Sequence, residues 1–199
     1  MNLDYETAKA NFLALNFQGC KEFFTENNHI LELGYYEILS ENLNEAKKLF
    51  KKISDEDIRA NWALFLISMI EECVNSNPSY FELRNFLEID LNILIQNAKG
   101  SYVHNILKYI DYMYTVNPEV YKFCARVFYN NDLREEGFYL LLRAKDSFYT
   151  DPELHYLLAC AYMDKGDKMQ ALHYVKTCQE VLPQYYPAVK LEKQLLSIA

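Results

Sequence analysis

Two stretches of this chain align with each other at a separation of 34 residues. The matched positions are Asn117-Pro118-Glu119 with Asp151-Pro152-Glu153, Ala125 with Ala159, Phe128 with Tyr162, Gly137 with Ala171, Leu141 with Val175, and Ala144 with Cys178. A fixed period of about 20 to 50 residues is typical of proteins built from stacked repeats. Each repeat is a pair of helices that cannot bury its apolar face alone, so neighbouring pairs must pack together. The period therefore favours a binding surface over a catalytic pocket.

The composition is that of a folded chain with many contact-forming side chains. Hydrophobic residues make up 51 % of the 199 residues, with only five glycines and five prolines, which excludes a disordered chain. Seventeen residues are tyrosines. Because tyrosine joins a large apolar ring to a polar hydroxyl, it suits half-buried seams and contact surfaces.

Charge is spread unevenly along the chain, whose net charge is −8. Residues 1–100 hold 16 acidic and 9 basic side chains, for −7, whereas residues 101–199 hold 12 and 11, for −1. This balance argues against a nucleic-acid partner and against an anionic membrane surface, both of which require basic patches. We interpret the acidic side chains as a solvated exterior, with a specific basic partner as the alternative.

The cysteines and the N-terminus indicate an intracellular protein. The five cysteines are odd in number, widely spaced and without a CxxC motif: Cys20, Cys73, Cys124, Cys160 and Cys178. Free thiols of this kind fit a reducing compartment. The first residues lack a basic start and an apolar run, and the most apolar stretch, Trp62 to Ile70, is too short to span a bilayer. We expect a cytoplasmic protein, or a nuclear one in a eukaryote.

Apolar residues recur at helical spacing throughout, and no segment alternates as a half-buried strand would. The regular part predicts helices over roughly 118–130, 133–147, 152–164 and 168–181. Between about residues 60 and 116 the register of the repeats is lost. There we expect three helices, over about 54–73, 80–98 and 102–116.

The stretch 151–184 resembles the tetratricopeptide repeat. In that family the first helix carries an aromatic residue, Leu-Gly and Tyr, and the second carries Ala, an aromatic residue and Pro. The corresponding residues here are His155, Leu158-Ala159, Tyr162, the turn residue Gly166, Ala171, Val175 and Pro183. Two weaker matches are 117–150, with Cys124-Ala125, Phe128, Gly137, Leu141 and Ala144, and 27–60, with Leu33-Gly34, Glu37 near the tyrosine position, Ala46, Phe50 and Ile53.

The resemblance implies an all-α fold, an α-α superhelix or solenoid of antiparallel helix pairs. We expect a single domain over 1–199, with an irregular middle and a capping helix at 187–198. Small residues at Ala159 and Ala171 would let two helices approach closely, and Pro183 would end the second helix.

The resemblance also implies a concave groove lined by the first helix of each pair. The groove-facing residues would be Lys122, Arg126, Tyr129 and Asn130 in one repeat and Tyr156, Cys160, Met163 and Asp164 in the next. Lys122 and Arg126 lie one turn apart and could hold an acidic or C-terminal carboxylate of a partner. The alternative is a solvated pair of charges on an ordinary helix. The flanking residues differ from those of the carboxylate-clamp proteins, since Glu153 and Leu157 follow here, so we do not predict that ligand.

We expect a non-enzymatic scaffold that binds a protein or peptide segment in its groove; the role of a subunit in a larger assembly is left open beside it. A homodimer is a variant, if the helix containing Trp62–Ile70 exposes apolar surface. A small secretion chaperone that shields an apolar client segment is the alternative function.

No catalytic or phosphate-binding motif is present, and we expect no cofactor, no metal and no small-molecule substrate. The four histidines lack the spacing of a zinc site. The alternative of a metal held by His155, His173 and Cys178 rests only on their lying in one repeat.

Overall fold

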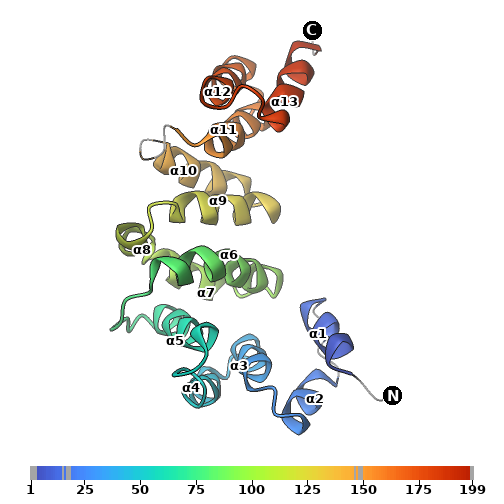
Figure 1. Cartoon of the computed structure of the whole chain (residues 1–199), viewed down its shortest axis with the longest axis vertical. Coiled ribbons are helices and arrows are strands. Elements are labelled where there is room, and N and C mark those ends of the chain that lie inside the picture. The colour runs from blue at the N-terminus through green and yellow to red at the C-terminus, as the bar shows by residue number, and fades with distance from the viewer. Residues whose placement is uncertain (1–3, 15, 17–18, 146, 148–149, 198–199) are drawn as a thin grey trace. The chain divides into compact units, whose positions relative to one another are not determined.

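The structure of the chain is a computed structural model, which describes residues 4–14, 16, 19–145, 147 and 150–197. These residues form thirteen α-helices and no β-strand, which confirms the all-α prediction. Helices adjacent in the sequence pack against each other in pairs (Figure 1). The chain divides into two compact units, unit 1 at Met1–Val116 and unit 2 at Asn117–Ala199. The expectation of one continuous repeat domain stays a prediction.

The described residues of unit 1 form eight helices. They are α1 (Tyr5–Leu13), α2 (Cys20–Glu26), α3 (Ile30–Leu39), α4 (Leu43–Lys51), α5 (Ile58–Ile70), α6 (Tyr80–Gln96), α7 (Gly100–Leu107) and α8 (Ile110–Val116). The α3–α4 pair falls in the weak repeat at 27–60. Its two helices come close at Gly34, where an added Cβ would lie 2.5 Å from the ring of the buried Phe50. The small residue of the motif thus allows the close packing of this pair.

The middle of unit 1, residues 58–116, contains four helices, whereas the sequence predicted three. The expected helix at 102–116 is divided into α7 and α8. At the division Lys108 and Tyr109 donate backbone bonds to carbonyls three residues back, Asn105 and Ile106. Such bonds tighten and end a helix. No glycine or proline marks this break, so the sequence carried no signal for it.

Helix α5 is buried, which corrects the expectation that it exposes apolar surface. Eight of its residues are buried: Ala60, Trp62, Ala63, Phe65, Leu66, Ile67, Met69 and Ile70. A helix that is apolar on all sides belongs in a core. The helix is shorter than the expected 54–73, because it begins at Ile58, where the Asp57 carboxylate accepts the backbone N–H of Arg59 at 2.8 Å and caps it.

A buried carboxylate joins three helices of unit 1. Asp90 of α6 accepts from the indole N–H of Trp62 at 2.6 Å and from the hydroxyl of Tyr35 at 3.1 Å, and it forms an ion pair with Arg59. Burial raises the pKa of Asp90, while the charge of Arg59 opposes that rise. These bonds join α3, α5 and α6. Moving the helices apart would break them and leave buried polar groups unpaired, so the network stabilises the packing of the three helices.

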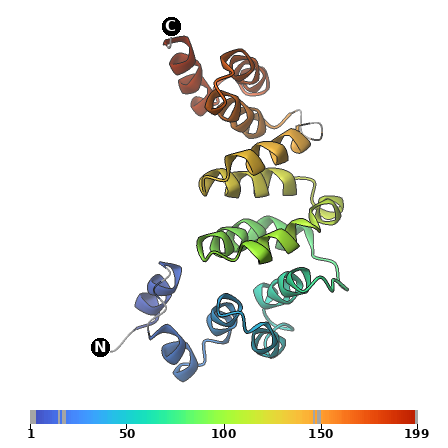
Figure 2. The ribbon, with the colours of Figure 1, turned by 180° about the vertical axis from the view of Figure 1, so that it is seen from behind.

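Unit 2 has the regular pattern that the 34-residue period predicts. Its helices are α9 (Val120–Asn130), α10 (Arg134–Ala144), α11 (Pro152–Asp164), α12 (Lys168–Val181) and α13 (Tyr186–Ser197). The four predicted repeat helices agree with α9 to α12 within three residues at each end. The pairs α9–α10 and α11–α12 lie side by side, and α13 packs on α12 (Figure 2). Helix α13 occupies the predicted cap at 187–198, of which residue 198 lies outside the described residues.

The core of the second pair is built from the motif residues. Ala159, Ala171, Val175 and Cys178 are fully buried, and α13 adds Ala188, Leu191 and Leu195 to the same cluster. In the first pair, an added Cβ at Gly137 would lie 2.6 Å from the ring of Tyr129. Small residues thus let the second helix of each pair approach the first, as the sequence pattern predicts.

Candidate functional site

Four side chains from α9 and four from α11 make up the predicted binding surface, here called the α9–α11 face. They are Lys122, Arg126, Tyr129 and Asn130 of α9, and Tyr156, Cys160, Met163 and Asp164 of α11. Asp151 fixes the start of α11, since its Oδ1 accepts the backbone N–H of Glu153 at 2.9 Å and of Leu154 at 3.3 Å. Pro152 follows at the first helical position, where its missing N–H costs no bond.

Lys122 is buried and surrounded by carboxylates. Its Nζ lies 2.5 Å from Asp151 Oδ2, 3.1 Å from Glu119 Oε1 and 3.3 Å from Glu153 Oε2, and the residue is 5 % exposed. Burial acts to lower the pKa of Lys122, but the bonds to Asp151 and Glu119 and the charge of Glu153 outweigh it, so the pKa lies above its ordinary value. The ammonium group is therefore held charged inside a cage of acceptors.

Arg126 extends the same network, because its Nη1 lies 2.5 Å from Glu153 Oε1. The two cations of α9 are thus paired with carboxylates of this chain. Lys122 is therefore not the solvated charge of the alternative reading, and the binding of a partner's carboxylate stays a prediction. Asp151 and Glu153 come from the next repeat, 29 and 27 residues from the cations they bind. Of the three carboxylates, only Glu119 could have been predicted as a partner from helical spacing, because it lies three residues before Lys122.

Aromatic and sulfur-containing side chains lie beside this network. Tyr156, Cys160 and Met163 recur at intervals of four and three residues, so they share one face of α11. All three are partly buried against the core of the α11–α12 pair. The ring of Tyr156 also meets that of Tyr185 edge-on, with centroids 5.7 Å apart. The row is therefore held firmly but keeps part of its surface in solvent.

Tyr129 of α9 has its ring at Gly137 of α10, and charged groups of α11 also act on its hydroxyl. Burial, followed by the negative charge of Asp164, raises the pKa of Tyr129 to about 12, and Cys160 contributes in the same direction. Burial also raises the pKa of Tyr156 to about 12, with a bond to Cys160 as the next cause. The two phenols thus stay protonated as hydrogen-bond donors over the whole physiological range.

The far end of the face is closed by a second ion pair. Arg134, at the start of α10, places Nη1 2.7 Å from Asp164 Oδ2. Asn130 is exposed at the end of α9. The structure therefore brings Lys122, Arg126 and Tyr129 together with residues of α11, while Asn130 makes no contact that defines the face. The part of these residues in binding stays a prediction.

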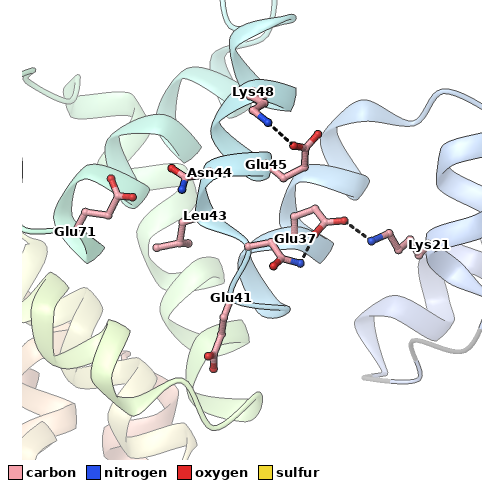
Figure 3. Close-up of a pocket in the computed structure, with 9 residues that line it drawn as sticks. Lys21, Glu37, Glu41, Leu43, Asn44, Glu45, Lys48 and Glu71 are labelled. Atoms are coloured by element: carbon pink, nitrogen blue, oxygen red, sulfur yellow. Dashed lines mark hydrogen bonds and ion pairs between the residues drawn. The ribbon is translucent and has the colours of Figure 1, made fainter.

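A hollow of about 650 Å³ lies in unit 1 and was not predicted (Figure 3). Its lining consists of Lys21, Glu37, Glu41, Asn42, Leu43, Asn44, Glu45, Lys48 and Glu71. Glu37, near the position of the motif tyrosine, is 4 % exposed and binds Lys21 at 2.8 Å and the Asn42 amide at 2.7 Å.

Each carboxylate of this hollow has a lysine partner. The pairs are Lys21–Glu37, Lys48–Glu45, Lys47–Glu71 and Lys99–Glu41, at 2.6 to 2.9 Å. Because each carboxylate is paired with a lysine, the hollow offers little net charge to a ligand. The hollow is therefore a weaker candidate than the α9–α11 face, which offers apolar side chains as well.

Within the described ranges, no group of three or more His, Cys, Asp or Glu side chains could hold a metal ion. His155 is buried and stacks on Tyr174, with centroids 6.2 Å apart, and His173 meets the same ring edge-on. In the same part of the chain, no helix combines the length and the apolar character needed to cross a bilayer.

Comparison of the chain with models of protein families, with curated proteins and with solved structures finds no match. The function of the face therefore has to follow from its own residues.

Proposed function

We propose that this protein is a non-enzymatic interaction module of tetratricopeptide-like architecture, whose α9–α11 face binds a segment of another polypeptide. Two helix pairs in a 34-residue register and a capping helix support this reading of unit 2. The buried network around Lys122 ties the first pair to the start of the second. Because the scaffold is fixed before binding, little conformational entropy is lost when a partner docks.

The observation that carries the proposal is the partly buried row of Tyr156, Cys160 and Met163 along one face of α11. Aromatic and methionine side chains are enriched at the centres of protein interfaces. A few rigid anchors of this kind supply most of the binding free energy in typical interfaces. Such a row binds apolar side chains by contact, and the phenol hydroxyls can bind backbone groups of the same segment.

The proposal is tested by selecting peptides from a random display library against the full chain. Binding of the selected peptides is then measured for the wild type, for Met163→Glu, and for Met169→Glu as the control. Met169 lies on α12 and is 77 % exposed, so its substitution should leave the α9–α11 face intact.

We expect Met163→Glu to weaken binding about 10-fold or more, because it places a charge in an apolar contact. Circular dichroism should show that both variants keep their helices. Equal affinities for the wild type and Met163→Glu would sink the proposal. The secretion-chaperone alternative stays a prediction; it requires in addition a stable client whose solubility depends on this protein.

A further inference from the structure

The charged residues at both ends of the row of Tyr156, Cys160 and Met163 indicate which kind of segment would bind there. Glu153 and Asp164 lie three residues before Tyr156 and four residues after Cys160, so both carboxylates share the face of α11 that carries the row. Eleven residues of helix separate them, or about 16 Å at 1.5 Å per residue. Their side chains are 34 % and 29 % exposed. An apolar row thus has an accessible carboxylate at each end.

The cations of the face do not cancel these carboxylates. Lys122 and Arg126 meet three carboxylates, those of Glu119, Asp151 and Glu153. At the other end, Arg134 meets Asp132 at 3.6 Å and Asp164 at 2.7 Å. Among the described residues, these ion pairs join three cations to five carboxylates. A partner's carboxylate would add a further negative charge to an already acidic network, whereas a partner's cation would relieve it.

We propose, on the basis of the proposed function, that the segment bound on this face carries apolar side chains flanked by basic residues, and that acidic segments are rejected. The rise of about 16 Å along α11 between these two residues matches about five residues of extended chain at about 3.3 Å each. A carboxylate accepts several hydrogen bonds, so Glu153 and Asp164 can each take a Lys or Arg in addition to the arginine already present. Charge sets the choice of partner, and the apolar row supplies the affinity.

The test uses peptides selected from the display library against the full chain, restricted to those whose binding is lost in Met163→Glu. Their sequences are compared with the unselected library. We expect Lys and Arg to be enriched on both sides of an apolar core and Asp and Glu to be depleted.

Affinities of one such peptide are then measured for Asp164→Asn and for Glu180→Gln, a control on the exposed surface of α12. We expect Asp164→Asn to weaken binding about three-fold at low salt, with the difference shrinking at high salt, and Glu180→Gln to have no effect.

The outcomes separate the two proposals. Selected peptides with acidic flanks, or with no preference in charge, would overturn the inference while the proposed function stands. The same holds if Asp164→Asn and Glu180→Gln have equal effects. If no selected peptide depends on Met163, the proposed function fails and the inference fails with it.

Discussion

At the scale of single residues, Gly34 is a position where the packing of two helices leaves no room for a side chain. The Cβ of an alanine there would lie 2.5 Å from two carbons of Phe50, a ring that is fully buried and cannot move aside. We expect Gly34→Ala to lower the free energy of unfolding by about 1–2 kcal/mol, because overpacking outweighs the gain in helix propensity.

The matched control is Gly100→Ala, since nothing lies within 4 Å of a Cβ at that position. Urea denaturation should show Gly100→Ala as neutral or slightly stabilising. Equal stability of Gly34→Ala and the wild type would mean that α3 and α4 do not approach as closely as described.

The raised pKa of Tyr156 predicts how the stability of the protein changes at alkaline pH. Burial raises its pKa from 10.0 to about 12, so the folded protein keeps a proton that the unfolded chain loses. The stability linked to this group is fully present below pH 10 and is lost as the pH rises toward 12. We expect Tyr156→Phe to lose less stability between pH 9 and pH 11.5 than the wild type, as measured by urea denaturation.

Tyr139→Phe serves as the control, because that ring is 62 % exposed. If both tyrosine variants follow the wild-type dependence on pH, then Tyr156 is not held as the structure describes.

Residue-level reasoning found the α9–α11 face but not its electrostatics. The 34-residue period aligns α9 with α11, and the resemblance to the tetratricopeptide repeat implied which positions, such as Tyr129 and Met163, face the groove. The partners of Lys122 and Arg126 lie in the next repeat, and spacing within one helix does not report contacts between repeats. The ion pairs of Lys122 and Arg126 could therefore be recognised only in the three-dimensional structure.

At the scale of elements, Lys122 links two helix pairs by joining α9 to the capping carboxylate of α11. Replacing it by methionine keeps much of the volume but leaves Glu119, Asp151 and Glu153 without their shared cation. We expect Lys122→Met to lower the free energy of unfolding by about 2 kcal/mol, less than for a fully buried pair because the carboxylates are partly solvated.

Lys176→Met on the exposed surface of α12 is the control and should change stability by less than about 0.5 kcal/mol. Thermal or urea denaturation measures both. A loss no larger than that of Lys176→Met would show that the two pairs are not joined through this lysine.

The sequence predicted elements well where glycine, proline or capping residues mark their ends. Asp151-Pro152 and Gly166 delimit α11, and Ser79 with Glu82 forms a capping box at the start of α6. The break between α7 and α8 has no such marker and was missed. The burial of α5 was also missed, although its run of apolar residues from Trp62 to Ile70 is typical of a core helix.

At the scale of the whole molecule, the two units differ in regularity and in charge. Unit 2 has the 34-residue period and a cap, whereas unit 1 has weaker repeat matches and, within residues 1–100, a charge of −7. The period predicted unit 2 because each of its helices packs on a neighbour in sequence. In unit 1, Tyr35 of α3 donates a hydrogen bond to Asp90 of α6, which lies 55 residues later in the sequence. A local sequence pattern does not predict such a contact.

The central claim is that the α9–α11 face binds a polypeptide, and photo-crosslinking tests it most directly. A selected peptide carrying a benzophenone at its central apolar position is bound to the full chain and irradiated, and the crosslinked residues are identified by mass spectrometry. The account predicts crosslinks to α9 and α11, centred on Tyr129, Tyr156 and Met163. Crosslinks confined to α10, α12 or unit 1 would contradict it.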